Sequence, residues 1–159
     1  MQTFFTSDFH IGHAAIIKYC NRPFKDVNEM NDEIVLRFNS IVKSEDVCFH
    51  LGDFAFNEKL VAPFLTRLNG THHLISGNHD GCFSSHKKYK KSLEKYISYG
   101  FFSVKEKMEL KIGNENVSIC HLPFSEKDDN DVRYMQFRPI NNGQFLLHGH
   151  CRQQPSPRW

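Results

Sequence analysis

Five short polar clusters along the sequence contain the residue types that bind metal ions or transfer protons. In chain order they are Asp8-Phe9-His10, Gly52-Asp53, Gly77-Asn78-His79-Asp80, His121-Leu122-Pro123 and Gly149-His150. Each cluster taken alone resembles an ordinary turn, in which Asn or Asp accepts local backbone hydrogen bonds. Each also follows an apolar run that predicts a strand. Five unrelated turns at five successive strand ends explain this repetition less well than one shared site.

The side chains in these clusters indicate a particular kind of metal chemistry. They offer carboxylates, imidazoles and one amide oxygen, without a thiolate. This mixture suits Mn²⁺, Fe, Ni²⁺ or Zn²⁺ better than Ca²⁺ or a structural zinc. Six candidate ligands exceed the need of one tetrahedral ion and fit two ions that share a carboxylate. Two ions about 3.5 to 4 Å apart clamp a phosphoryl group and generate a hydroxide nucleophile, so the residues predict a dinuclear hydrolase.

A parallel sheet with crossover helices would bring the first three clusters to one edge. The strands are predicted at Thr3–Thr6, Asp46–Leu51 and His72–Ser76, and each ends at a polar cluster. Helices are predicted between and after them, at Asp26–Lys43, at about 57–68 and at about 84–95. In open α/β sheets, ligands bind where the strands end in loops at their carboxyl edge. The strand–helix order therefore predicts that the clusters converge.

The local signals at the element boundaries give further expectations. Asp26 and Glu29 are predicted to form a capping box, Pro63 to kink or restart the second helix, and Asn69-Gly70 to end it. After residue 100 the pattern changes. It predicts an antiparallel hairpin made by Phe101–Ile112 and Val117–Cys120. A polar loop at Ser125–Asn142 and a last short strand at Phe145–Leu147 are predicted to follow.

Composition limits the classes of protein to which the chain can belong. With 159 residues, 40% of them hydrophobic, the sequence predicts one folded domain over residues 1–159. Its formal net charge of +2 is too balanced to argue for a polyanionic partner from charge alone. It has no run of about 18 apolar residues and no signal-peptide pattern, so we expect neither a membrane span nor secretion. The five cysteines are scattered without a C-x-x-C pair, which favours reduced thiols and a cytoplasmic location.

The ordered clusters resemble the calcineurin-like metallophosphoesterases, whose blocks run D-x-H, G-D, G-N-H-[DE], H and G-H-x-H. The resemblance extends from residue 3 to residue 150, and the stretch from Ser7 to Phe24 is similar to a small bacterial and phage branch of that family. It implies an α/β fold in which a two-sheet mixed β-sandwich is flanked by helices. It also implies hydrolysis of a phosphodiester or phosphomonoester in a phosphorylated small molecule or nucleotide, with two divalent metal ions, Mn²⁺ first among them.

The resemblance also implies a role for each matched residue. Asp8, His10 and Asp53 would hold the first metal ion, and Asp53, Asn78, His121 and His150 the second, so that Asp53 bridges. His79 would protonate the leaving oxygen or stabilise charge on the phosphoryl group, oriented by Asp80. Arg22 is the best candidate for a contact to the substrate phosphate, with a surface salt bridge as an equal alternative.

The end of the sequence departs from the family pattern. The last block reads Gly149-His150-Cys151-Arg152, so Arg152 stands where a ligand of the first metal is expected. Arg152 is therefore predicted to pair with a substrate phosphate, and His13, His148 or Cys151 would be the substitute ligands. The chain ends at Trp159, where members of the resembled family continue into another strand and helix, so a C-terminally truncated or frame-altered product is one expectation.

Two other functions stay open on the sequence alone. A chain that lacks one ligand could be a catalytically weak or inactive module that binds a partner protein. The lysine-rich run from His86 to Lys91 could instead meet nucleic acid, although a solvated helix face is the commoner meaning of such a run. Metal-dependent turnover of a diester would favour the enzyme, and strongly salt-dependent binding would favour the nucleic-acid reading.

Overall fold

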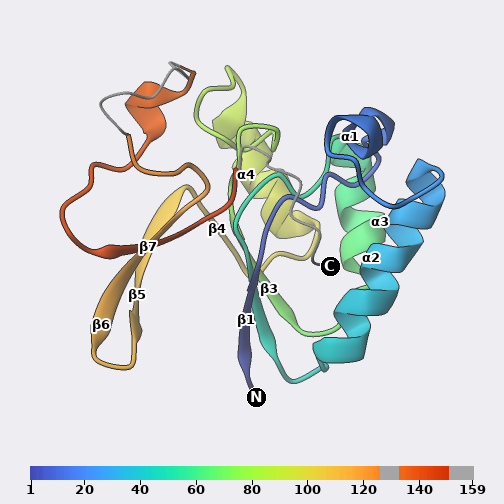
Figure 1. Ribbon diagram of the computed structural model, residues 1–159, viewed down its shortest axis with the longest axis horizontal. Helices are drawn as coiled ribbons and strands as arrows, with labels where there is room; N and C mark the ends of the chain where they lie inside the picture. The colour runs from blue at the N-terminus through green and yellow to red at the C-terminus, as the bar shows by residue number, and fades with distance from the viewer. Residues whose placement is uncertain (126–132, 151–159) are drawn as a thin grey trace.

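Two β-sheets and a set of helices make up the fold of the computed structural model, which describes residues 1–125 and 133–150 (Figure 1). The first sheet is parallel throughout, in the order β1 (Thr3–Thr6), β2 (Val47–His50), β3 (Thr71–Ile75) and β4 (Ser103–Lys105). The second is mixed: β6 (Glu115–Cys120) pairs antiparallel with β5 (Lys107–Ile112) and parallel with β7 (Phe145–His148). The predicted mixed two-sheet α/β fold is confirmed.

Helices cover one face of the first sheet, and the second sheet packs on its other face (Figure 1). The helices are α1 (Ala14–Tyr19), α2 (Val27–Ile41), α3 (Val61–Leu65) and α4 (Tyr89–Ser98), with short 3-10 turns η1 (Glu58–Leu60) and η2 (Met135–Phe137). Leu74 joins the core on the helix side, whereas its neighbour Ile75 packs against Ile119 between the sheets. Successive side chains of a strand point to opposite faces, so β3 serves both cores.

The start of α2 agrees with its prediction almost residue by residue. The Asp26 carboxylate accepts hydrogen bonds from the backbone N–H groups of Asn28 and Glu29, each at 2.9 Å. The Glu29 carboxylate reaches back to the N–H of Lys25 at 2.6 Å instead of that of Asp26. The Glu29 side chain thus bonds one residue earlier than in a standard capping box. The Asp26 bonds still satisfy N–H groups that have no partner within the helix.

Four boundaries differ from the predictions. The stretch Phe101–Ile112 is not one strand, because β4 pairs with β3 of the first sheet and β5 pairs with β6 of the second, with the change at Glu106. The helix predicted over about 57–68 divides into η1 and α3, and Pro63 lies in the first turn of α3, where a missing N–H costs no bond. The helix predicted at about 84–95 begins and ends later, as α4. The helix α1 was not predicted from the sequence.

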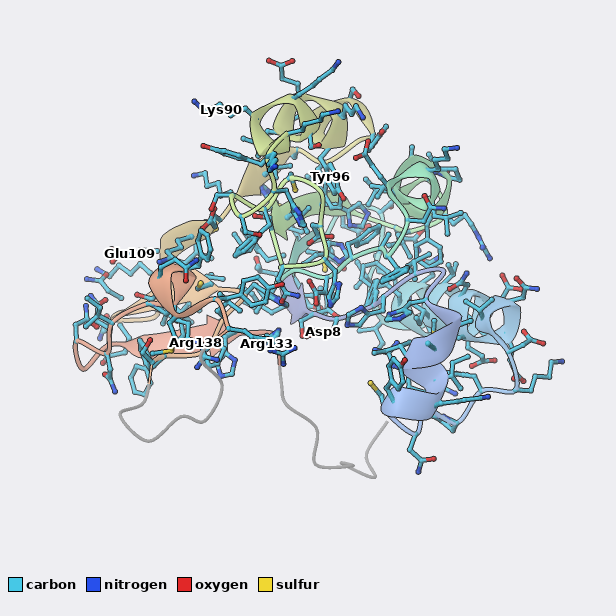
Figure 2. The ribbon with its side chains drawn as sticks, turned by 90° about the horizontal axis from the view of Figure 1, so that it is seen from above. Asp8, Lys90, Tyr96, Glu109, Arg133 and Arg138 are labelled. Atoms are coloured by element: carbon cyan, nitrogen blue, oxygen red, sulfur yellow. The ribbon has the colours of Figure 1, made fainter. Side chains whose placement is uncertain are left out.

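None of the helices within residues 1–125 and 133–150 is long and apolar enough to cross a membrane. The lysine-rich run continues into α4, and Figure 2 shows Lys90 on the outer side of that helix, far from Asp8. A solvated helix face, the commoner reading of the run, agrees with this placement.

Candidate active site

Two groups of side chains share Asp53 at the edge of the sheets where β1, β2, β3, β6 and β7 end. The first group is Asp8, His10 and Asp53, and the second group is Asp53, His121 and His150. In each group the possible ligand atoms all lie within 4.8 Å of one another. Asn78 adjoins the second group, since its Oδ1 is 3.1 Å from Nε2 of His121. The fold therefore brings together all six residues that were predicted to hold metal.

The first group has room for a cation between its side chains. Nε2 of His10 lies 3.7 Å from Oδ1 of Asp8 and 3.7 Å from Oδ2 of Asp53, too far for a direct hydrogen bond to either. Nδ1 of the same ring is buried and has no hydrogen-bond partner among the described residues. An imidazole nitrogen that faces two carboxylates across such a gap is a donor set that a divalent cation fits.

The second group is held by a backbone contact behind its histidine. His121 is fully buried, and its Nδ1–H donates to the carbonyl oxygen of Leu51 at 2.7 Å. That bond turns Nε2 toward Oδ1 of Asp53, at 3.5 Å, and toward the Asn78 amide oxygen. The ring of His150 lies edge-on to the ring of His121, with 5.2 Å between centroids. A histidine whose far nitrogen is tied to a carbonyl is the usual form of a metal ligand in proteins.

Opposite charges in the second group shift the pKa values of its members. Burial lowers the pKa of His121, but Asp53 and Asp8 outweigh it and raise the value to about 9. Burial raises the pKa of Asp53, but the His121 hydrogen bond and the nearby imidazoles outweigh it and lower the value to about 2. The pair therefore favours an ionised carboxylate beside a protonated ring. A cation at Nε2 would take the place of that proton, because a ligating nitrogen must be deprotonated.

Backbone strain marks four of the candidate ligands. Asp8, His10, Asp53 and His150 have φ angles of 56°, 54°, 53° and 47°, in the left-handed region that residues other than glycine rarely adopt. Two backbone bonds between loops hold the first strained turns: Asp8 N–H to Gly52 O at 3.0 Å, and His10 N–H to Asp53 O at 2.9 Å. Strain of this kind persists where the surroundings over-determine it, most often at functional sites.

The glycines that begin two of the clusters are required by close packing. A Cβ added at Gly77 would collide with the carboxylate and backbone nitrogen of Asp53, and one added at Gly52 would collide with Nδ1 of His121. The φ angle of Gly52, 92°, also excludes most other residues. The Gly-Asp and Gly-Asn pairs of the sequence thus let the β2 and β3 loops touch.

Asp80 ties these two loops together through the backbone. It is fully buried, and its carboxylate accepts from the N–H groups of Asp53 at 2.8 Å, Phe54 at 3.0 Å and Gly77 at 2.8 Å. Burial and the charge of Asp53 raise the pKa of Asp80 to about 7, against the effect of these donors. Asp80 was predicted to orient the side chain of His79, whereas the hydrogen bonds found come from backbone N–H groups of the β2 and β3 loops.

His79 lies at the solvent side of the site. Its backbone N–H donates to Oδ1 of Asp53 at 2.9 Å, and its side chain, 42% exposed, places Nε2 at 4.0 Å from Oδ2 of Asp53. Its ring is 5.5 Å from that of His10. Burial lowers the pKa of His79, and Asp53 partly opposes this effect. The ring is thus next to both groups and open to a ligand.

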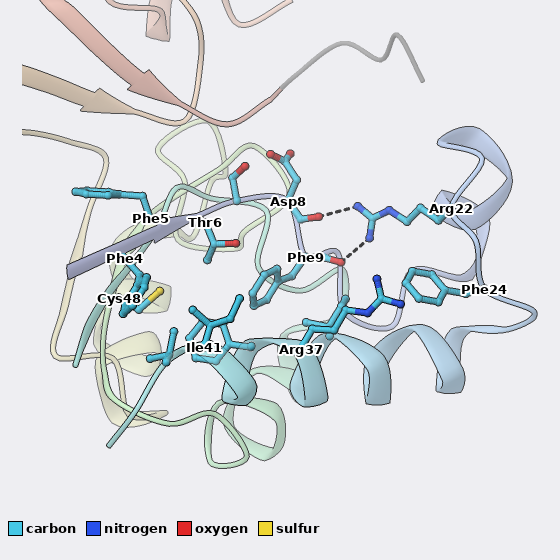
Figure 3. A pocket seen from close by; sticks show the side chains of 14 residues that line it. Phe4, Phe5, Thr6, Asp8, Phe9, Arg22, Phe24, Arg37, Ile41 and Cys48 are labelled. Atoms are coloured by element: carbon cyan, nitrogen blue, oxygen red, sulfur yellow. Dashed lines mark hydrogen bonds between the residues drawn. The ribbon is translucent and has the colours of Figure 1, made fainter. Parts of the chain in front are cut away.

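Arg22 clamps the first loop from outside. Its Nη1 donates to the carbonyl of Phe9 at 2.9 Å and its Nη2 to the carbonyl of Asp8 at 2.7 Å, as Figure 3 shows. Neither of the two readings of Arg22, a phosphate contact or a surface salt bridge, describes these bonds, which hold the strained turn in place. Arg22 and Asp8 also line one end of a cavity of about 310 Å³ between β1 and α2.

The proposed substitute ligands are placed as follows. His13 is near His10, with 5.6 Å between ring centroids, but belongs to neither group. His148 is exposed at the end of β7, and its Nδ1 contacts the neighbouring Gly149 carbonyl. Cys151 and Arg152 lie outside the described residues.

Three features near the site were not predicted from the sequence. They are the clamp formed by Arg22, the backbone ties of Asp80, and rings from Tyr19 and Phe56 that gather around His13. The only signal in the sequence for the last feature was spacing, since His13 follows His10 by three positions as Phe56 follows Asp53.

Known proteins resemble the chain over about half of its length or over most of it. Uncharacterized protein MJ1445 of Methanocaldococcus jannaschii is 44% identical over 77 residues, which cover 46% of this chain and 44% of that protein. Gene 66 protein of Mycobacterium phage L5 is 27% identical over 158 residues, which cover 93% of this chain and 76% of the phage protein. The chain thus spans less than half the length of the archaeal relative, and the phage relative fits the predicted phage-type branch.

The fold also matches that of a solved structure, described as the crystal structure of the protein of unknown function AQ665 from Aquifex aeolicus. The two superpose with a TM-score of 0.71 and 26% sequence identity, over 97% of this chain and 81% of the other. A family model described as calcineurin-like phosphoesterase matches residues 1–152, which include all five polar clusters. On this match, the chain belongs to the calcineurin-like phosphoesterase family.

Proposed function

We propose that the chain is a metal-dependent phosphoesterase that uses two divalent cations to hydrolyse a phosphodiester or phosphomonoester, with a diester favoured. The observation that carries the proposal is the pair of Asp and His groups that share the Asp53 carboxylate. Mn²⁺ is the first choice of metal, with Fe, Ni²⁺ and Zn²⁺ as alternatives, because the donors are oxygens and imidazole nitrogens.

The donor set fits the cations on this chain's own geometry. Asp8, His10 and Asp53 would hold the first ion, and Asp53, Asn78, His121 and His150 the second. When bound, the ions supply Lewis acidity toward phosphoryl oxygens and lower the pKa of water. The tie from His121 to the Leu51 carbonyl supports this assignment, since it presents Nε2 to the other ligands.

The remaining residues would position the ligands or move a proton. His79 is exposed and adjacent to both groups, so it can donate a proton to the leaving oxygen or stabilise charge on the phosphoryl group. Asp80 acts through the backbone, by fixing the turn that carries Asp53. Arg22 acts on the turn at Asp8 in the same way. In this proposal Asp80 and Arg22 are positioning residues.

The test is turnover of bis-p-nitrophenyl phosphate by the purified chain with metal added back. We expect activity with Mn²⁺ that is lost in excess chelator and returns when Mn²⁺ is restored. p-Nitrophenyl phosphate in the same assay distinguishes a monoesterase from a diesterase. If neither ester is hydrolysed at saturating Mn²⁺, Fe²⁺, Ni²⁺ or Zn²⁺, the proposal is wrong and a binding module is the better description of the chain.

A further inference from the structure

A cluster of aromatic rings borders the candidate site on its open side. The rings of His13 and Phe56 are stacked, with 4.0 Å between centroids and 14° between planes. Tyr19, the last residue of α1, stands edge-on to His13 at 6.4 Å. The Phe56 ring lies 6.0 Å from the ring of His79, and the His13 ring 6.3 Å from it. The cluster thus adjoins the residue proposed to act on the leaving oxygen.

The loops that carry the ligands also fix these rings. After His10 and Asp53 the two loops continue side by side, with Ile11 N–H bonded to Phe54 O at 3.1 Å and Phe56 N–H bonded to Ile11 O at 3.0 Å. Ile11 and Ala55 form a parallel bridge between them. His13 and Phe56 are therefore brought together by the same pairing that brings His10 to Asp53, and the stack is held before any ligand arrives.

The cluster presents apolar aromatic surface to solvent. Phe56 is 52% exposed and Tyr19 is 74% exposed, although the backbone of Phe56 is bonded into the loop pair. A rigid, half-exposed ring costs little entropy when another flat ring stacks on it. Every nucleobase offers such a face, and stacking of bases on aromatic side chains is a common mode of recognition.

We propose that Phe56, backed by His13 and flanked by Tyr19, is a stacking site for the base of a nucleotide whose phosphate lies at the two groups around Asp53. The inference rests on the proposed function for the position of the phosphate, and it narrows the substrate to phosphoesters of nucleosides. The ring centroids of Phe56 and His79 are 6.0 Å apart, so a base stacked on Phe56 and a phosphate beside His79 would be close enough for one sugar to link them.

The test compares two ligands that share sugar and phosphate and differ in the base. Calorimetry of the Mn²⁺-loaded chain with AMP and with ribose 5-phosphate gives their two dissociation constants. We expect AMP to bind about tenfold more tightly, the lower part of the range for one stacked base. Phe56→Ala should remove this preference and leave the affinity for ribose 5-phosphate unchanged, whereas Phe56→Trp should keep it.

Phe102→Ala is the matched control. Phe102 is 74% exposed, and its N–H bonds to His72 O near the start of β3, at the opposite end of the sheet from the site. This variant should keep the preference for AMP. Equal affinities for AMP and ribose 5-phosphate in the parent chain, or no detectable binding of either, would overturn the inference, as would a preference that survives Phe56→Ala. Diester hydrolysis without a base preference would leave the proposed function intact and reject the stacking site alone.

Discussion

The two groups that share Asp53 differ in how firmly their histidines are held. In the second group His121 is fully buried, and its far nitrogen is bonded to the Leu51 carbonyl at 2.7 Å. In the first group the far nitrogen of His10 is buried without a partner among the described residues. Asn78 also adds an amide oxygen to the second group.

Sharing one carboxylate therefore does not make the two groups equal. A hydrogen bond behind a ligating imidazole fixes its orientation and raises its basicity, and losing such a partner typically costs about 10- to 100-fold in metal affinity. We therefore expect the second group to bind its ion more tightly than the first.

The largest effect is expected at the residue that both groups share. Asp53→Asn removes the only carboxylate common to them, so activity and high-affinity metal binding should both be lost. Asp32→Asn is the control, because Asp32 is an exposed acid that pairs with Arg67 on the surface. Metal content measured by atomic absorption and turnover measured with bis-p-nitrophenyl phosphate check the result. Near-normal turnover in Asp53→Asn would refute the dinuclear assignment.

A change at His79 should lower the rate of catalysis without changing the difference in metal affinity between the two groups. His79→Ala removes an exposed ring that belongs to neither group, so kcat should fall by about 10²- to 10⁴-fold, the usual contribution of a general acid. Metal titrations should still show the parent's two affinities. A matching loss of bound metal would mean that His79 is a ligand.

Separate removal of the two histidines measures the difference directly. His121→Ala removes the ligand whose far nitrogen is bonded to the backbone, so binding of the tighter ion should be abolished. The loss of metal affinity should exceed the roughly 10- to 100-fold that is typical when only a hydrogen-bond partner of a ligand is removed. His10→Ala should abolish only the weak ion. Calorimetric titration with Mn²⁺ in each variant gives the remaining affinity. If His10→Ala removes the tighter ion, the comparison is reversed.

A smaller effect is expected at Arg152, which stands where the family pattern has a histidine. A guanidinium is permanently charged and has no lone pair for a cation. Arg152→His should tighten the weaker ion and raise activity at limiting metal, which would narrow the gap between the groups. Arg37→His, on the exposed face of α2, is the control. Two equally tight ions in the unmodified chain would contradict the prediction and point to a substitute ligand.

The sequence was sufficient to predict where the strands end, but it did not predict to which sheet each strand belongs. Thr3–Thr6 was predicted with its true bounds, because a β-prone run stops at a polar pair. The division of Phe101–Ile112 was missed, since nothing local at Glu106 reports that β4 pairs with β3 and β5 with β6. Pairing between distant segments is a tertiary property that periodicity does not encode.

The candidate site shows the same limit at the level of single residues. Residue type and order were enough to predict that six possible ligands lie together, because strands that end at one edge of a sheet place their loops side by side. The partners of Asp80 and Arg22 could not be read in this way. Both bind backbone groups of other loops, and a backbone N–H or carbonyl leaves no trace in the identity of its residue.

The backbone hydrogen bonds of Asp80 lead to an expectation about the order of folding and metal binding. Two of them, from the N–H groups of Asp53 and Phe54, join the loop of β2 to that of β3, and the third, from Gly77, lies within the β3 loop. Because none of these bonds needs a cation, we expect the ligand loops to be arranged during folding, before any metal ion binds. Unlike a zinc finger, which collapses when stripped, the chain should keep its far-ultraviolet circular dichroism in excess chelator. Loss of that signal on chelation would show that the ions take part in folding. A set of ligand loops that forms without metal would also leave the choice of metal to whichever suitable ion the surroundings supply.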